Sequence, residues 1–194
     1  MRVLLQLKHW QLFIVLIVMP LVMDFIFIGT SIFSNNDPSP LMTIFLIVII
    51  FSLCIFFAWF YALGTNLHKK LPGSVEMNLT KFKIFLVIPF LFILFVCLLM
   101  LFMINNSIAG KEPPTIGVGI LGILLPVDLF SFFCIFYCLY FNAKVLKAVE
   151  LQREVSFEDY VGEFFLIWFF PIGLWFIQPK VNKLFAVKNG LPHD

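Results

Sequence analysis

Two acidic residues, Asp24 and Asp128, lie inside the long apolar runs of this sequence. An ionised carboxylate within a bilayer costs at least about 2.5–3.5 kcal/mol, so such residues usually face other protein groups. Asp24 lies nine residues before the end of its run and Asp128 lies twelve residues after the start of its run. Both run ends are expected on the same side of a membrane, so the two depths differ by about 5 Å. If the two helices are neighbours, the pair is a candidate proton or cation site. The alternative is that each is a neutral acid whose hydrogen bond fixes helix register.

Three glycines, Gly117, Gly119 and Gly122, have the G-x-G-x-x-G spacing of dinucleotide-binding proteins. That motif functions after a β-strand, with an acidic residue about 20 positions further on that binds the ribose. Here the glycines follow Lys-Glu-Pro-Pro-Thr, and Leu139 and Tyr140 occupy the position of the acid. We interpret the glycines as helix packing contacts, because small residues let helices approach closely in lipid.

The cysteines, histidines and remaining acidic residues do not form a recognisable catalytic or metal-binding motif. Cys134 and Cys138 share a helix face, and we interpret them as small apolar fillers. The histidines are scattered, so we expect neither a metal site nor a cofactor. An acidic cluster that precedes an apolar segment, together with Lys180, leaves a membrane enzyme acting on lipid as an alternative. The cluster comprises Glu158, Asp159 and Glu163.

The composition limits the environment in which this chain can fold. Of its residues 62% are hydrophobic and 12% are charged, whereas a soluble domain carries roughly 25% charged residues. The apolar residues also fall in long unbroken runs and are not scattered as in a soluble core. This combination indicates an integral membrane protein.

Four apolar runs are long enough to cross a bilayer as helices, which takes roughly 20 residues for about 30 Å of hydrocarbon. Only helices satisfy their own backbone hydrogen bonds over such runs. We therefore predict an all-α polytopic integral membrane protein with a four-helix transmembrane bundle over residues 1–141. The predicted spans are 12–33, 41–63, 84–104 and 116–141.

The basic residues predict the orientation of the bundle. With the exception of Lys111, they flank the spans on one side when the C-terminal segment does not cross, and the positive-inside rule makes that side cytoplasmic. We expect a bacterial plasma (inner) membrane, with both termini in the cytoplasm. Several bases form a candidate face for anionic lipid headgroups or for a protein partner. They are Lys69, Lys70, Lys144, Lys147, Arg153 and Lys180.

The C-terminal third is expected to contain three parts. Residues 142–160 form an amphipathic cytoplasmic connector, interpreted as a solvated helix, with Ser156 as the cap of the next helix. Residues 161–179 are apolar but short for a span, and Pro171 and Gly173 interrupt them. We predict a re-entrant or interfacial segment here, with a tilted fifth span as the alternative. Residues 180–194 form a basic cytoplasmic tail.

The stretch from Val149 to Leu184, which includes "SFEDYVGEFFLIWFFPIGLWFIQPKVNKL", resembles small multi-span membrane proteins of bacteria. The resemblance implies no activity, cofactor or site residue. The sequence as a whole favours a non-enzymatic membrane subunit or accessory protein, with a proton- or cation-conducting oligomer using Asp24 and Asp128 as the alternative. Its expected partners are the bilayer and another membrane or cytoplasmic protein, which includes a second copy of the chain. Nucleic acid is not expected.

Overall fold

The chain is built from helices, and no strand occurs in the part of it that the structure describes. The computed structural model describes residues 5, 7–33, 39–110 and 118–186. Four helical stretches are long and apolar enough to cross a membrane, which confirms the predicted helical class and the four long apolar helices. These stretches are His9–Thr30, Leu41–His68, Leu79–Ile108 and Leu124–Leu151.

The first long stretch is helical throughout, but its hydrogen-bond pattern changes near Pro20. Proline has no N–H for the carbonyl four residues earlier, and a short π-helix immediately precedes it. The hydroxyl of Ser52 donates to the carbonyl of Val15 at 3.2 Å, which ties this π-turn to the next helix. The three pieces are α2 (His9–Phe13), η1 (Ile14–Val18) and α3 (Met19–Phe33).

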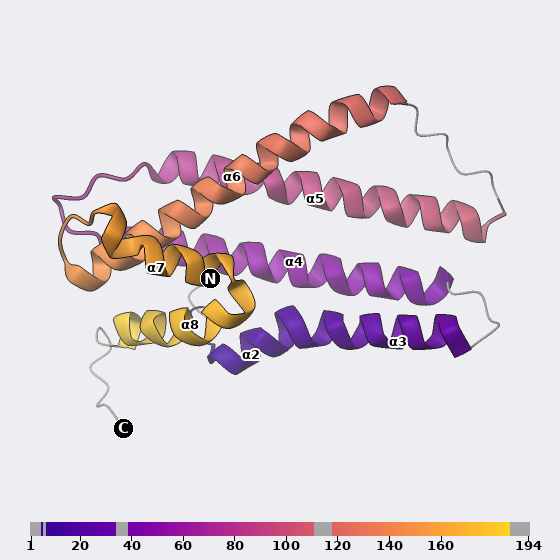
Figure 1. Cartoon of the computed structure of the whole chain (residues 1–194), viewed down its shortest axis with the longest axis horizontal. Coiled ribbons are helices and arrows are strands. Elements are labelled where there is room, and N and C mark those ends of the chain that lie inside the picture. Colours follow the sequence, from indigo (N-terminus) through magenta and orange to yellow (C-terminus); the bar gives the residue numbers. More distant parts are fainter. Residues whose placement is uncertain (1–4, 6, 34–38, 111–117, 187–194) are drawn as a thin grey trace.

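The other three long helices extend beyond the predicted apolar runs. Their bounds are Ser39–His68 for α4, Leu79–Ile108 for α5 and Val118–Leu151 for α6. The side chain of Asn78 caps α5 by accepting from the backbone N–H of Lys81 at 2.9 Å. Figure 1 shows α3, α4 and α5 lying roughly parallel along the long axis, while the first half of α6 diverges from α5.

The apolar segment 164–177 is divided between two helices, α7 (Phe157–Trp168) and α8 (Phe170–Ala186). The break falls at Phe169, two residues before Pro171, because proline has no N–H to continue the hydrogen bonds of α7 but is tolerated in the first turn of α8. The two helices form a hairpin beside the end of the molecule where α4 is joined to α5 (Figure 1). In the hairpin, α7 packs on α6 and α8 packs on α2.

The hairpin changes the environment of the connector that follows the predicted fourth span. Residues 142–151 continue α6, and their apolar side chains are buried as far as Val149, so the interpretation of this stretch as a solvated linker is wrong. The reason is that α4, α5 and α7 all pack on α6, whereas sequence alone does not show which helices cover this stretch. Phe141 stacks on Phe82 with ring centroids 4.3 Å apart, joining α6 to α5 at the same level.

Two buried glycines permit close approach between helices. A Cβ on Gly64 would lie 2.5 Å from the ring of Phe82 and 2.9 Å from Oδ1 of Asn142, so α4, α5 and α6 meet here only without a side chain. A Cβ on Gly173 would lie 1.5 Å from the carbonyl oxygen of Leu166. The hairpin therefore requires glycine at residue 173.

We expect Gly173→Ala to destabilise the hairpin by about 1–3 kcal/mol or more, because a methyl group would overlap backbone atoms of α7. The measurement is thermal unfolding of the purified chain in detergent. Gly162→Ala is the matched control, because nothing lies within 4 Å of its Cβ and alanine favours helix by about 0.5–1 kcal/mol. Equal melting temperatures for the two variants would contradict the hairpin geometry.

Candidate functional site

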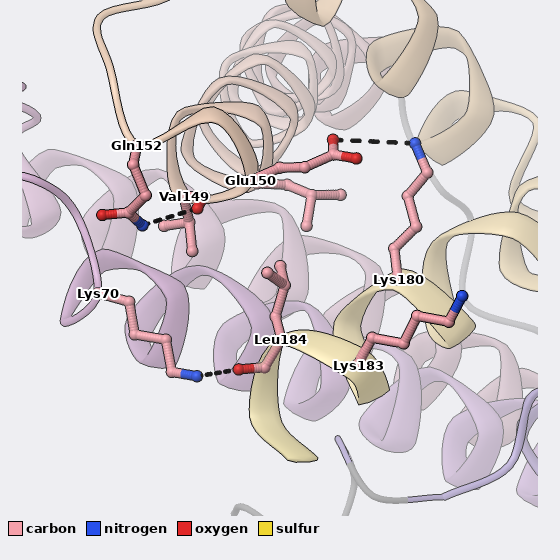
Figure 2. Close-up of a pocket in the computed structure, with 8 residues that line it drawn as sticks. Lys70, Val149, Glu150, Gln152, Lys180, Lys183 and Leu184 are labelled. Carbon is pink, nitrogen blue, oxygen red and sulfur yellow. Dashed lines mark hydrogen bonds and ion pairs between the residues drawn. The ribbon is translucent and has the colours of Figure 1, made fainter. Parts of the chain in front are cut away.

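A cavity of about 660 Å³ lies between the last turns of α6, the end of α8 and the loop that follows α4. Figure 2 shows Glu150 paired with Lys180 on one side of this cavity and Lys70 reaching the carbonyl of Leu184 on the other. The described lining residues include three lysines and one glutamate, whose formal charges sum to two positive charges. The lining residues are Lys70, Leu146, Val149, Glu150, Gln152, Lys180, Lys183 and Leu184.

A cluster of four charges positions one wall of the cavity. Glu163 on α7 is only 5% exposed, and its Oε1 lies 2.9 Å from Nζ of Lys180 and 3.3 Å from Nζ of Lys147. Glu150 accepts from Lys147 at 3.0 Å and lies 4.0 Å from Nζ of Lys180. The cluster therefore joins α6, α7 and α8, and a buried carboxylate with two ammonium partners is satisfied.

The charge state of Glu163 follows from two opposed effects. Burial by itself raises the pKa of this carboxyl, but the hydrogen bond from Lys180 and the nearby Lys147 ammonium outweigh burial. The pKa of Glu163 is therefore held below its ordinary value of 4.5. Glu163 is consequently the ionised partner that both lysines require at neutral pH.

The start of α7 is fixed by a local polar arrangement that the sequence predicts. Ser156 is the N-cap residue, and its backbone N–H donates to Oδ2 of Asp159 at 2.9 Å. The guanidinium of Arg153 contacts the other carboxylate oxygen at 2.9 Å. The bond from the Ser156 backbone, followed by Arg153, holds the pKa of Asp159 below its ordinary value. Asp159 thus orders the turn that leads into the hairpin.

A second polar node, which the sequence analysis missed, holds the N-terminal segment against the hairpin. Gln178 is fully buried, and its Oε1 accepts from the indole N–H of Trp59 at 3.0 Å. Its Nε2 donates to the backbone carbonyls of Leu5 and Leu7 at 3.2 Å and 2.9 Å. The feature of the sequence that could have indicated this node is Gln178 itself, a glutamine directly at the end of an apolar run and before Pro179.

The predicted basic face is divided by the structure. Lys70 and Lys180 line the cavity, and Lys147 reaches its Glu150. Lys69 is exposed outside the lining, and Lys144 donates to the hydroxyl of Tyr140 at 3.3 Å. Arg153 pairs with Asp159 at the start of α7. Lys183, which lines the cavity, was not among the predicted face residues.

The two carboxylates inside the long helices do not meet within one chain. Asp24 on α3 and Asp128 on α6 are both exposed. Figure 1 shows α3 and the first half of α6 on opposite sides of the molecule, with α4 and α5 between them. A site that uses both would therefore require more than one copy of the chain.

Of the three predicted glycine contacts, the surroundings are described only for Gly122. Nothing lies within 4 Å of a Cβ built on Gly122, so this glycine does not serve close packing between helices of one chain. Gly119 belongs to α6, and Gly117 lies outside the described residues. Cys134 and Cys138 are buried free thiols on α6, and the Cys138 thiol points to the carbonyl of Phe82 at 3.9 Å.

Comparisons with known proteins add no further assignment, because no family model, curated protein or solved structure matches the chain significantly. The class is therefore defined by the structure itself. It is an all-helical protein with four helices able to span a membrane and a helical hairpin at one end.

We expect Glu163→Gln to lower stability by about 1–3 kcal/mol near neutral pH, because Lys147 and Lys180 each lose one charged partner and keep only Glu150. Since the folded pKa lies below 4.5, Glu163 contributes stability above about that pH, and the contribution is lost as the pH falls through the folded pKa. The difference between wild type and variant should therefore narrow in acid. Thermal unfolding in detergent across this pH range measures it.

The control for this experiment is Glu154→Gln. Glu154 is exposed, and its carboxylate makes no ion pair with the described residues. A pH-independent difference for Glu163→Gln, or an equal loss in Glu154→Gln, would show that the cluster does not stabilise the hairpin.

Proposed function

We propose that the four long helices cross a bacterial plasma membrane, with both termini in the cytoplasm. The support is that Lys70, Lys180 and Lys183 gather at one end of the helices, and bases concentrate on the cytoplasmic side of membrane proteins. In this arrangement α7 and α8 enter from the cytoplasmic side and return to it, and the basic end lies toward anionic lipid headgroups. The hairpin is then re-entrant and not a fifth span.

We further propose that the protein is a non-enzymatic subunit of a membrane assembly. The observation that carries this proposal is the outward position of Asp24 and Asp128 on long apolar helices. A carboxyl group that faces hydrocarbon is costly, and intramembrane acids usually face protein or water. Helices of a partner, or of further copies of this chain, would cover these faces.

Partner helices that cover Asp24 and Asp128 could also form a conducting site with them. Proton or cation conduction through Asp24 and Asp128 is the alternative function, and it needs neighbouring subunits to bring the two side chains together. A lipid-directed enzyme has less support, because Glu163 and Asp159 are engaged by Lys180, Lys147 and Arg153.

The orientation predicts which cysteine variants react with a membrane-impermeant maleimide. Ala109→Cys should label in intact cells, whereas Lys69→Cys and Lys183→Cys should label only after the membrane is opened. Wild type is the control for the native thiols, including the exposed Cys54. Labelling of Lys183→Cys in intact cells would show that the C-terminal segment crosses the membrane as a fifth span. Labelling of Lys69→Cys in intact cells would show that the orientation is the reverse of the one proposed.

The subunit proposal predicts that Asp24→Leu/Asp128→Leu lowers the mass of the complex extracted in mild detergent, because both helix faces become compatible with lipid. Native mass spectrometry measures the mass and shows whether the partner is another protein or a second copy. Phe25→Leu is the control, since Phe25 is an exposed apolar neighbour of Asp24. A wild-type chain that is monomeric, or a double variant of unchanged mass, would rule the proposal out. Flux in liposomes that requires the two carboxyls would favour the conducting alternative.

A further inference from the structure

The lysine-lined cavity has the size and the chemistry of a small-molecule site. Ligand sites in proteins typically occupy about 300–1,000 Å³, and this cavity of about 660 Å³ falls within that range. It is therefore larger than a single inorganic ion requires. Its walls come from three segments that are distant in sequence, so the cavity exists only once the hairpin has docked (Figure 2).

The charges of the lining are unbalanced in favour of an anion. Among the described residues of the lining, the only carboxylate is that of Glu150, and it is already paired with Lys147, which lies outside the lining. Lys180 is shared between Glu163 and Glu150. Lys183 is exposed and forms no ion pair with any residue in the described part of the chain.

The third lysine is held in place by its own contacts. Nζ of Lys70 donates to the carbonyl of Leu184 and lies 4.0 Å from the ring centroid of Phe185. These two contacts hold the ammonium group of Lys70 at the edge of the cavity. Lys70 thus adds fixed positive charge on the side of the cavity opposite Lys180 (Figure 2).

Three of the other lining residues, Leu146, Val149 and Leu184, are apolar and suit an organic group, and the fourth, Gln152, is polar. Leu146 and Val149 are buried core residues of α6, and Leu184 is half-buried on α8. Lysine ammonium groups bind phosphate as compact charges. We propose that this cavity binds a phosphate ester, with the phosphate on Lys180 and Lys183 and the organic part against the leucine and valine side chains.

Two sources can supply this chemistry, a soluble phosphate ester or the headgroup of an anionic phospholipid. The inference deepens the proposed function by giving its cytoplasmic end a ligand. Binding to the purified full-length chain is measured in detergent or nanodiscs and does not depend on orientation. Failure of the site and failure of the proposed membrane orientation are therefore distinguishable.

The test uses isothermal titration with glycerol phosphate and inorganic phosphate, and native mass spectrometry of adducts with phosphatidylglycerol and phosphatidylcholine. We expect a phosphate ester to bind, and Lys183→Gln to weaken it about tenfold or more, the worth of one charge-assisted hydrogen bond. Lys183→Arg should retain more affinity than Lys183→Gln. Lys183 forms no ion pair with a described carboxylate, so the fold should tolerate both changes.

Lys69→Gln is the matched control, because it removes the same charge from an exposed residue outside the lining. Binding of glycerol phosphate assigns a soluble source, and selective phosphatidylglycerol adducts that Lys183→Gln removes assign a lipid source. Both outcomes support the site. If Lys69→Gln and Lys183→Gln weaken phosphate binding equally, the binding depends only on general surface charge, and the proposal is overturned. Absence of binding by either kind of probe would overturn it as well.

Discussion

The docking of α8 against α2, α4 and α7 is the interaction on which the organised end of this molecule depends. It combines two kinds of polar contact in an apolar setting, the ion pairs of Glu163 with Lys180 and Lys147 and the hydrogen bonds of Gln178. Buried polar groups are costly when unpaired, so these contacts specify one register of the hairpin. Without that register, the last turns of α6 would lose their cover and the lysine cavity would lose a wall.

The two ends of the molecule differ in packing because polar pairs and close glycine contacts are concentrated at the hairpin end. At the hairpin end, buried side chains include Trp59, Phe82 and Phe141, and three helices approach closely at Gly64. Toward the other end, α6 diverges and many apolar side chains of α3 are exposed (Figure 1). In lipid there is no hydrophobic force that drives apolar helices together, so close packing requires small residues or polar pairs. The described residues supply both mainly at the hairpin end.

Several features followed directly from the sequence. Long apolar runs with few charges predict helices long enough to span a membrane, because a helix alone satisfies its backbone without water. The Ser156 cap, with Asp159 three residues later, predicted the start of α7. Pro171 and Gly173 predicted an interruption, and the structure places the break just before them, at Phe169. These are local effects, fixed by neighbours in the chain.

What the sequence determined by itself is the class of structure, since apolar run length, caps and proline positions act over a few turns. Only the tertiary structure decided that the apolar residues from Ala143 to Val149 are buried, that Glu163 pairs with Lys180, and that Lys70 lies across a cavity from Lys180. It also placed α3, which carries Asp24, and the first half of α6, which carries Asp128, on opposite sides of the molecule. These outcomes depend on which helix faces pack together, and helices of nearly uniform apolar character carry little periodic signal to specify that choice.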